Sequence, residues 1–128
     1  MANEALPAPV RQLIARYIQS VEQLEVLLLL RSQPQRAWTV GEVYDVIRSS
    51  QPSIAARLQT FASDGFLAEE KGPPQTFRFA PQDENMRSAL DQTATAYQTW
   101  RVRVIEAIFT PAADPVQSFA DAFKLRKP

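Results

Sequence analysis

The side chains that could do acid–base or metal chemistry in this sequence are carboxylates, lysines and tyrosines, because cysteine and histidine are absent. Without cysteine there is no disulfide, no thiolate zinc site and no thiol nucleophile. Without histidine there is no Ser-His-Asp triad and no imidazole ligand for a metal. Two pairs of adjacent carboxylates remain, Glu69-Glu70 and Asp83-Glu84. Neighbouring side chains on a strand or helix point in different directions, so we expect no enzyme, no catalytic residue, no metal site and no cofactor.

The composition is that of one globular domain, or of one domain with an appended helix. Of the 128 residues, 45% are hydrophobic and 22% are charged. Fourteen basic residues balance fourteen acidic ones, whereas domains that bind nucleic acid are usually basic. The longest apolar run, residues 26–30, is far shorter than the roughly 20 residues of a membrane span, and the N-terminus lacks the pattern of a secretory signal. We therefore expect a cytoplasmic protein with no membrane partner.

Two helices are predicted at the start of the chain. Apolar residues step by three and four over residues 7–19, which predicts an N-terminal helix within residues 1–19. Ser20 and Gln23 fit a capping box that opens a second helix, running to about residue 32. This second helix is apolar nearly all round, so we expect it to be central and buried.

A short third helix and a longer fourth one follow. Thr39 and Glu42 form another capping box, which opens a helix over residues 40–47. Pro52 suits the first turn of the next helix, and Gly65 is well placed to end it in a left-handed conformation. The short spacing between these two helices predicts a tight turn.

The pattern then changes from helical to alternating. Residues 66–70 and 76–80 are short strand candidates, joined by the turn-rich residues 71–75. Phe77 and Phe79 share one face of the second strand, and the polar residue between them takes the other face. We expect a β-hairpin.

The helical period returns over residues 82–110, with an apolar seam at heptad spacing. The seam comprises Met86, Leu90, Thr93, Tyr97, Trp100, Val104 and Ala107. We expect one long helix whose seam joins two copies, because a hairpin alone cannot bury a helix of about 28 residues, or about 40 Å. The alternative is that the seam packs on its own chain. Tyr97 and Trp100 either line a ligand pocket or, as is usual for aromatic residues at seam spacing, belong to a core.

Residues 114–128 predict a short terminal helix and tail, which begins at an Asp-Pro cap. Phe119 and Phe123 lie one turn apart on this helix and form its apolar edge. This edge is either packed on the rest of the chain or available to another protein.

The order of elements over residues 20–80 resembles a winged helix-turn-helix domain, as found in bacterial transcriptional regulators of the MarR and PadR kinds. The stretches that carry the resemblance are SVEQLEVLLLLRSQ, TVGEVYDVI, QPSIAARLQTFASDGFL and TFRFA. The run LQTFASDGFL is similar to the family pattern L-x-x-L-x-x-x-G-[LF]-[ILV], with Phe61 in place of the second leucine. The fold class that follows is mainly α, with a small β-hairpin wing and a long C-terminal helix.

The resemblance implies a transcriptional regulator that acts as a homodimer on double-stranded DNA. Helix 52–64 would enter the major groove, where arginine and glutamine can read base edges. The wing, residues 66–80, and the turn before the helix would contact phosphates. The candidate DNA-binding residues are Arg48, Ser49, Ser50, Gln51, Ser53, Arg57, Gln59, Thr60, Lys71 and Arg78.

The local charge leaves a second function open. Residues 31–80 hold six basic and five acidic side chains, and an outward Arg57 is equally typical of a solvated surface. Glu69 and Glu70 at the base of the wing would repel phosphate unless they face away from it. The alternative function is a winged-helix module that binds a protein partner and has lost DNA binding.

Overall fold

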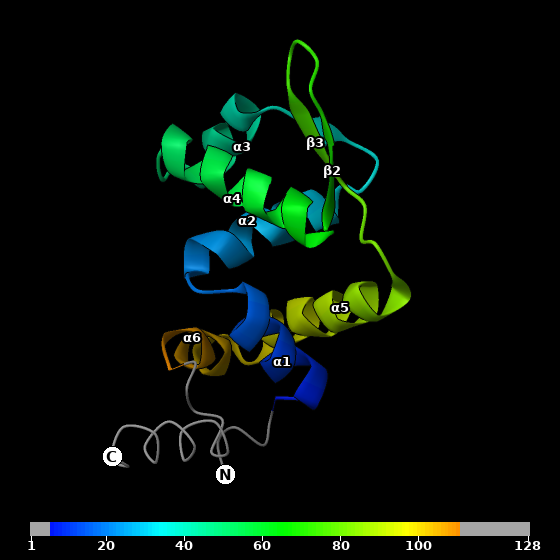
Figure 1. Cartoon of the computed structure of the whole chain (residues 1–128). Helices are drawn as coiled ribbons and strands as arrows, with labels where there is room; N and C mark the ends of the chain where they lie inside the picture. The colour runs from blue at the N-terminus through cyan, green and yellow to red at the C-terminus, as the bar shows by residue number, and fades with distance from the viewer. Residues whose placement is uncertain (1–5, 111–128) are drawn as a thin grey trace, which may run out of the picture. The chain divides into compact units, whose positions relative to one another are not determined.

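The computed structural model describes residues 6–110 (Figure 1). Within this range six helices and three short strands follow one another. They are α1 (Ala8–Tyr17), α2 (Val21–Ser32), β1 (Ala37–Trp38), α3 (Val40–Ile47), α4 (Gln51–Asp64), β2 (Leu67–Glu70), β3 (Thr76–Phe79), α5 (Glu84–Thr99) and α6 (Arg101–Phe109). The expectation of a mainly helical protein with a small β-hairpin is confirmed.

The chain divides into two compact units. One unit is Val21–Asp91, and the other combines the described residues on either side of it, 6–20 and 92–110. The first unit starts where the sequence analysis places the boundary, after the N-terminal helix. It ends later than the expected residue 80, because the first half of α5 belongs to it.

The strands of the first unit form an antiparallel sheet in the order β1-β3-β2. The hairpin β2–β3 is the expected one, with Leu67 opposite Phe79. The sequence analysis missed β1, in which Trp38 lies opposite Phe77. A strand of two residues is too short to show the alternating pattern by which strands are recognised.

The core of this unit lies between α2, α4 and the inner face of the sheet. Its buried side chains are Leu24, Val26, Leu27, Leu30, Trp38, Val43, Ile54, Leu58, Phe61, Phe66, Leu67, Phe77 and Phe79. The helix α2 contacts α3, α4 and β3, which confirms the buried central helix expected from its apolar sequence. Phe61 and Phe66 meet edge to face, with ring centroids 5.9 Å apart.

Local capping interactions fix the start of α3 and both ends of α4. The Thr39 hydroxyl accepts from the Glu42 amide at 3.1 Å, and the Glu42 carboxylate accepts from the Thr39 amide at 3.0 Å. This is the expected capping box. The Ser50 hydroxyl caps α4 by accepting from the Ser53 amide at 3.1 Å. The other end of α4 is also as expected, because Gly65 ends it with φ +97°.

In the other unit α1 contacts α6. The apolar residues of α1 that have helical spacing are buried, and so are Val104 and Ile108 of α6. The residues of α1 in this set are Val10, Leu13 and Ile14. The contact buries one stripe of each helix, which is how short amphipathic helices gain stability.

The expectation of one long helix over residues 82–110 is wrong. The backbone leaves the helical conformation at Trp100, with φ −129° and ψ 56°, so that α5 and α6 are separate helices. Threonines and bulky β-branched or aromatic side chains are frequent around this point, and such residues have modest helix propensity.

The seam is buried within a single chain. Leu90, Thr93, Tyr97 and Val104 are all buried, whereas Trp100 keeps 39% of its surface exposed. Several of its side chains are thus covered by the chain itself, and an interface between two copies along this seam stays a prediction. The predicted terminal helix over residues 114–128, with Phe119 and Phe123, lies outside the described residues.

Candidate nucleic-acid interface

The helix α4 has a buried inner face and a polar outer face. Ile54, Leu58 and Phe61 lie in the core. The exposed residues of α4 are Gln51, Pro52, Ala56, Gln59, Thr60 and Ser63. This outer face carries hydrogen-bonding groups but no charge. The helix contacts β2, and the tip of the hairpin β2–β3 projects beyond α3 and α4 (Figure 1).

The one basic residue of α4 points at an acidic residue of α2. Arg57 Nε donates to Glu22 Oε1 at 2.8 Å, in an ion pair whose side chains are 33% and 17% exposed. The Ser53 hydroxyl donates to the same oxygen at 2.7 Å. From the α3–α4 turn, the Ser49 hydroxyl donates to the other carboxylate oxygen, Glu22 Oε2. Three of the predicted DNA-binding residues therefore converge on a carboxylate of their own chain. We call Glu22, Ser49, Ser53 and Arg57 the Glu22 cluster.

The Glu22 cluster lowers the pKa of its carboxyl group. Partial burial raises this pKa, but the hydrogen bonds from Ser49, Arg57 and Ser53, together with the charge of Arg57, outweigh burial and lower the pKa below its ordinary value. Glu22 is therefore ionised at neutral pH, and it neutralises Arg57.

A second carboxylate links α4 to the hairpin. Glu69 Oε2 accepts from Gln75 Nε2 at 2.5 Å and from Gln59 Nε2 at 3.3 Å. The Gln75 hydrogen bond lowers the pKa of Glu69 most, and it outweighs the opposing effect of desolvation. We call Glu69, Gln59 and Gln75 the Glu69 cluster. It places Gln59, a predicted base-reading residue, against the wing.

The two acidic residues of β2 lie on opposite faces of the sheet. Glu69 lies opposite Phe77 on the inner face, and Glu70 lies opposite Thr76 on the outer face. The expectation that they point in different directions is confirmed.

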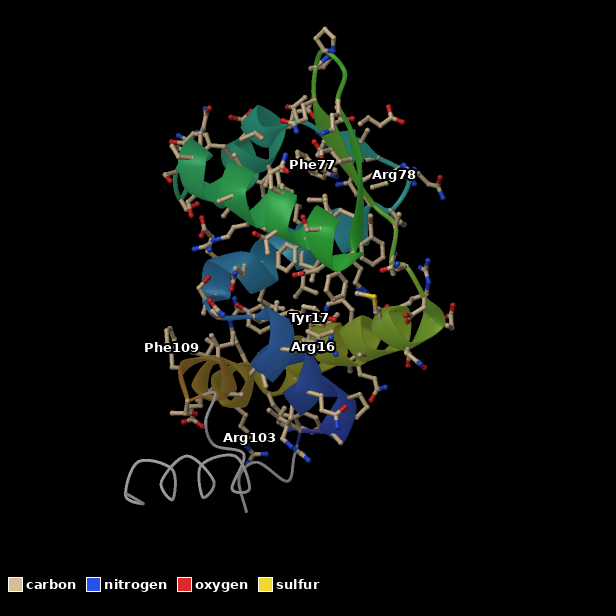
Figure 2. All side chains as sticks on the ribbon, viewed as in Figure 1. Arg16, Tyr17, Phe77, Arg78, Arg103 and Phe109 are labelled. Atoms are coloured by element: carbon tan, nitrogen blue, oxygen red, sulfur yellow. The ribbon has the colours of Figure 1, made fainter. Side chains whose placement is uncertain are left out.

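Three exposed basic residues lie on elements other than α4. Arg48 ends α3 in a left-handed conformation, with φ +63°, and its guanidinium lies 5.1 Å from the centroid of the Tyr44 ring. Lys71 is exposed in the hairpin turn. Arg78 is exposed on the outer face of the sheet, opposite Ala37 and Ala68. Figure 2 shows Arg78 on the side of the strand away from the side of Phe77.

The structure thus sorts the predicted DNA-binding residues into five groups. Ser49, Ser53 and Arg57 join the Glu22 cluster, and Gln59 joins the Glu69 cluster. Ser50 caps α4. Gln51 and Thr60 are exposed on α4, and Arg48, Lys71 and Arg78 are exposed around it.

Sequence reasoning missed two members of these clusters, Glu22 and Gln75. Glu22 lies 35 positions before Arg57, and no local pattern relates the two. Their opposite charges are the only signal in the sequence that could have suggested the pair.

Over residues 6–110, no cluster of three or more acidic side chains is arranged to hold a metal ion. Within the same range, none of the helices combines the length and the apolar character needed to cross a membrane.

Comparisons with known proteins give no relative of this chain. No protein-family model matches it, no curated protein matches it, and no solved structure matches it. Its function therefore has to be inferred from the residues described above.

Proposed function

We propose that residues 21–80 form a winged helix-turn-helix domain that binds double-stranded DNA and acts in transcriptional regulation. The observation that carries the proposal is the order of elements. A short strand separates α2 from α3, the capped turn leads into α4, and a hairpin follows whose second strand pairs with β1. In domains of this kind α4 is the helix that enters the major groove, and the hairpin is the wing.

The exposed side chains of α4 suit the reading of base edges. Gln59 can bridge the N6 and N7 atoms of adenine, and Thr60 can accept from or donate to either partner of a base pair. Neither side chain carries charge, so each contributes to recognition of sequence rather than to general attraction.

The three exposed basic residues outside α4 suit contacts to phosphates. Arg48 lies at the approach to α4, Lys71 lies at the tip of the hairpin, and Arg78 lies on the sheet. Because Arg57 is paired with Glu22, few cations remain for the backbone, and we expect weak non-specific binding with a shallow dependence on salt.

A homodimer is part of the proposal, since two-fold regulators place two recognition helices about 34 Å apart on the duplex. Sedimentation equilibrium measures the state directly, and a mass equal to one chain at every protein concentration would remove the dimer from the proposal.

Anisotropy titrations against genomic fragments and random duplex at low salt test DNA binding. Arg78→Ala should weaken binding to all duplexes and reduce the slope of log affinity against log salt by about one. Arg103→Ala removes the same charge from α6 and serves as the matched control, with no expected effect. Equal binding of every fragment and of random duplex would overturn the proposal, as would identical behaviour of the two variants.

A protein-binding module is the second candidate, and a specific observation favours it. The Glu22–Arg57 pair leaves the outer face of α4 uncharged. This candidate predicts no change of anisotropy with any duplex at low salt. It also predicts a stable partner that the wild type recovers in a pull-down and that Thr60→Arg loses, because a new charge at the centre of a protein interface prevents docking.

A further inference from the structure

The Glu22 cluster has the donors of an anion site. Two hydroxyls and a guanidinium, from the α3–α4 turn and from α4, are directed at one carboxylate of α2. The planar guanidinium fork fits a carboxylate and a phosphate equally well, and serine hydroxyls donate to either. The three donors therefore form a site that holds the Glu22 carboxylate. The chemistry of the same donors also suits a phosphate.

The site is open enough for exchange. The Arg57 side chain is one-third exposed, and Ser49 lies on the exposed α3–α4 turn. Glu22 accepts from Arg57 through Nε, whereas a guanidinium offers five N–H donors in all. Because solvent screens an ion pair at this exposure, the pair is weak enough for another anion to compete with it.

We propose that Glu22 is an internal competitor of DNA phosphate for Ser49, Ser53 and Arg57, and that it acts as a specificity determinant by lowering non-specific affinity. This inference rests on the proposed DNA-binding function. While Glu22 holds Arg57, the domain makes about one phosphate contact fewer on any duplex. Recognition then depends more on the uncharged readers Gln59 and Thr60. The neutral outer face of α4 then raises the ratio of specific to non-specific binding.

The test uses Glu22→Gln, Arg57→Ala and the double variant, titrated with a random 20-base-pair duplex over a range of salt. Glu22→Gln keeps an oxygen that accepts from the serines but releases Arg57. It should bind random duplex about fivefold more tightly, with a salt slope steeper by about one. Arg57→Ala should bind within about twofold of wild type, and the double variant should lose the gain.

The control is Glu106→Gln, which removes one negative charge from an exposed position of α6. It should leave the affinity unchanged, since the effect depends on the contact with Arg57 and not on net charge. Thermal melts followed by circular dichroism establish that each variant is folded at the titration temperature.

Two results would overturn this inference and leave the proposed DNA binding intact. One is a Glu22→Gln variant that binds random duplex no more tightly than wild type. The other is an Arg57→Ala variant that weakens binding as much as Arg78→Ala does, which would mean that Arg57 already contacts the backbone.

A readout without DNA separates this inference from the proposed function. In a titration with inorganic phosphate followed by NMR, the Arg57 Nε–H resonance of Glu22→Gln should shift, and the shift should be smaller in wild type. If no variant binds any duplex, the proposed function fails, and the phosphate titration alone tests whether the three donors form an anion site. An unshifted resonance in Glu22→Gln would then show that the three donors are not an anion site.

Discussion

The Glu22 cluster and the Glu69 cluster hold α4 in different ways. Glu22 lies on α2, is mostly covered, and pairs with a cation of α4. Glu69 lies on the hairpin and accepts only from the neutral amides of Gln59 and Gln75. The first half of α4 is thus joined to the helical core by an ion pair, and the second half is joined to the hairpin by a hydrogen bond from a neutral amide to a carboxylate.

The two clusters differ in the charge of the side chain that α4 contributes. The cation of α4 pairs with Glu22, while Gln59, which could read a base, donates its neutral amide to the Glu69 carboxylate. Neutralising either cluster should therefore have different consequences: changes at Glu22 affect attraction to any polyanion, and changes at Glu69 affect the orientation of Gln59.

The comparison assumes that the core holds α4 in place and that the two clusters only adjust it. Leu58→Ala tests this assumption, because Leu58 is fully buried and such truncations cost about 2–5 kcal/mol. The free energy of unfolding from urea titration should fall by that amount. Ser63→Ala, on the exposed side of the same helix, is the matched control and should stay within about 0.5 kcal/mol of wild type. Equal losses in the two variants would contradict the assumption.

The Glu22 cluster should make a contribution to stability that depends on pH. Because the folded-state pKa of Glu22 is lowered, its contribution is present above the ordinary value of 4.5 and is lost as the pH falls through the folded-state value. Glu22→Gln should lower the free energy of unfolding by about 1 kcal/mol at pH 7.

Urea titrations at a series of pH values check this expectation. The difference between wild type and Glu22→Gln should shrink as the pH falls below 4.5. A difference that stays constant down to the most acidic pH at which both variants fold would show that the carboxylate charge is not what stabilises the cluster.

Changes in the Glu69 cluster should have the smallest effect on stability. Glu69→Gln leaves a partly exposed side chain that still accepts one hydrogen bond, so the urea midpoint should match that of wild type. The preference among duplexes should change instead, since Gln59 loses its charged acceptor. Anisotropy with a preferred fragment and with random duplex measures this, and Glu70→Gln on the outer face is the control. A large loss of stability with unchanged preference would make Glu69 a structural residue.

Short-range rules predicted most of the helical boundaries. The Thr39–Glu42 capping box and the Gly65 stop act within a few residues of chain, so their signals are complete in the local sequence. The hairpin was predicted for the same reason, because a short turn joins its two strands.

Contacts between distant segments were not predictable in the same way. The pairing of β1 with β3 and the ion pair of Glu22 with Arg57 depend on how the elements pack. The heptad seam of α5 and α6 predicted an apolar face but not the residues that pack on it. Several side chains of this face are buried within the chain. Of the predicted site, the sequence indicated which residue types surround α4, whereas their pairing was visible only in three dimensions.

The short strand β1 has a consequence for the order of folding. Ala37 and Trp38 pair with residues of β3, and two helices and a strand lie between them along the chain. A hairpin in isolation is marginally stable, and closing a sheet over a long stretch of chain slows the search for the native state. Pairing of β1 with β3 therefore requires the chain to return over the whole of α3, α4 and β2, and hydrogen exchange of the β3 amide protons measures how often this sheet opens.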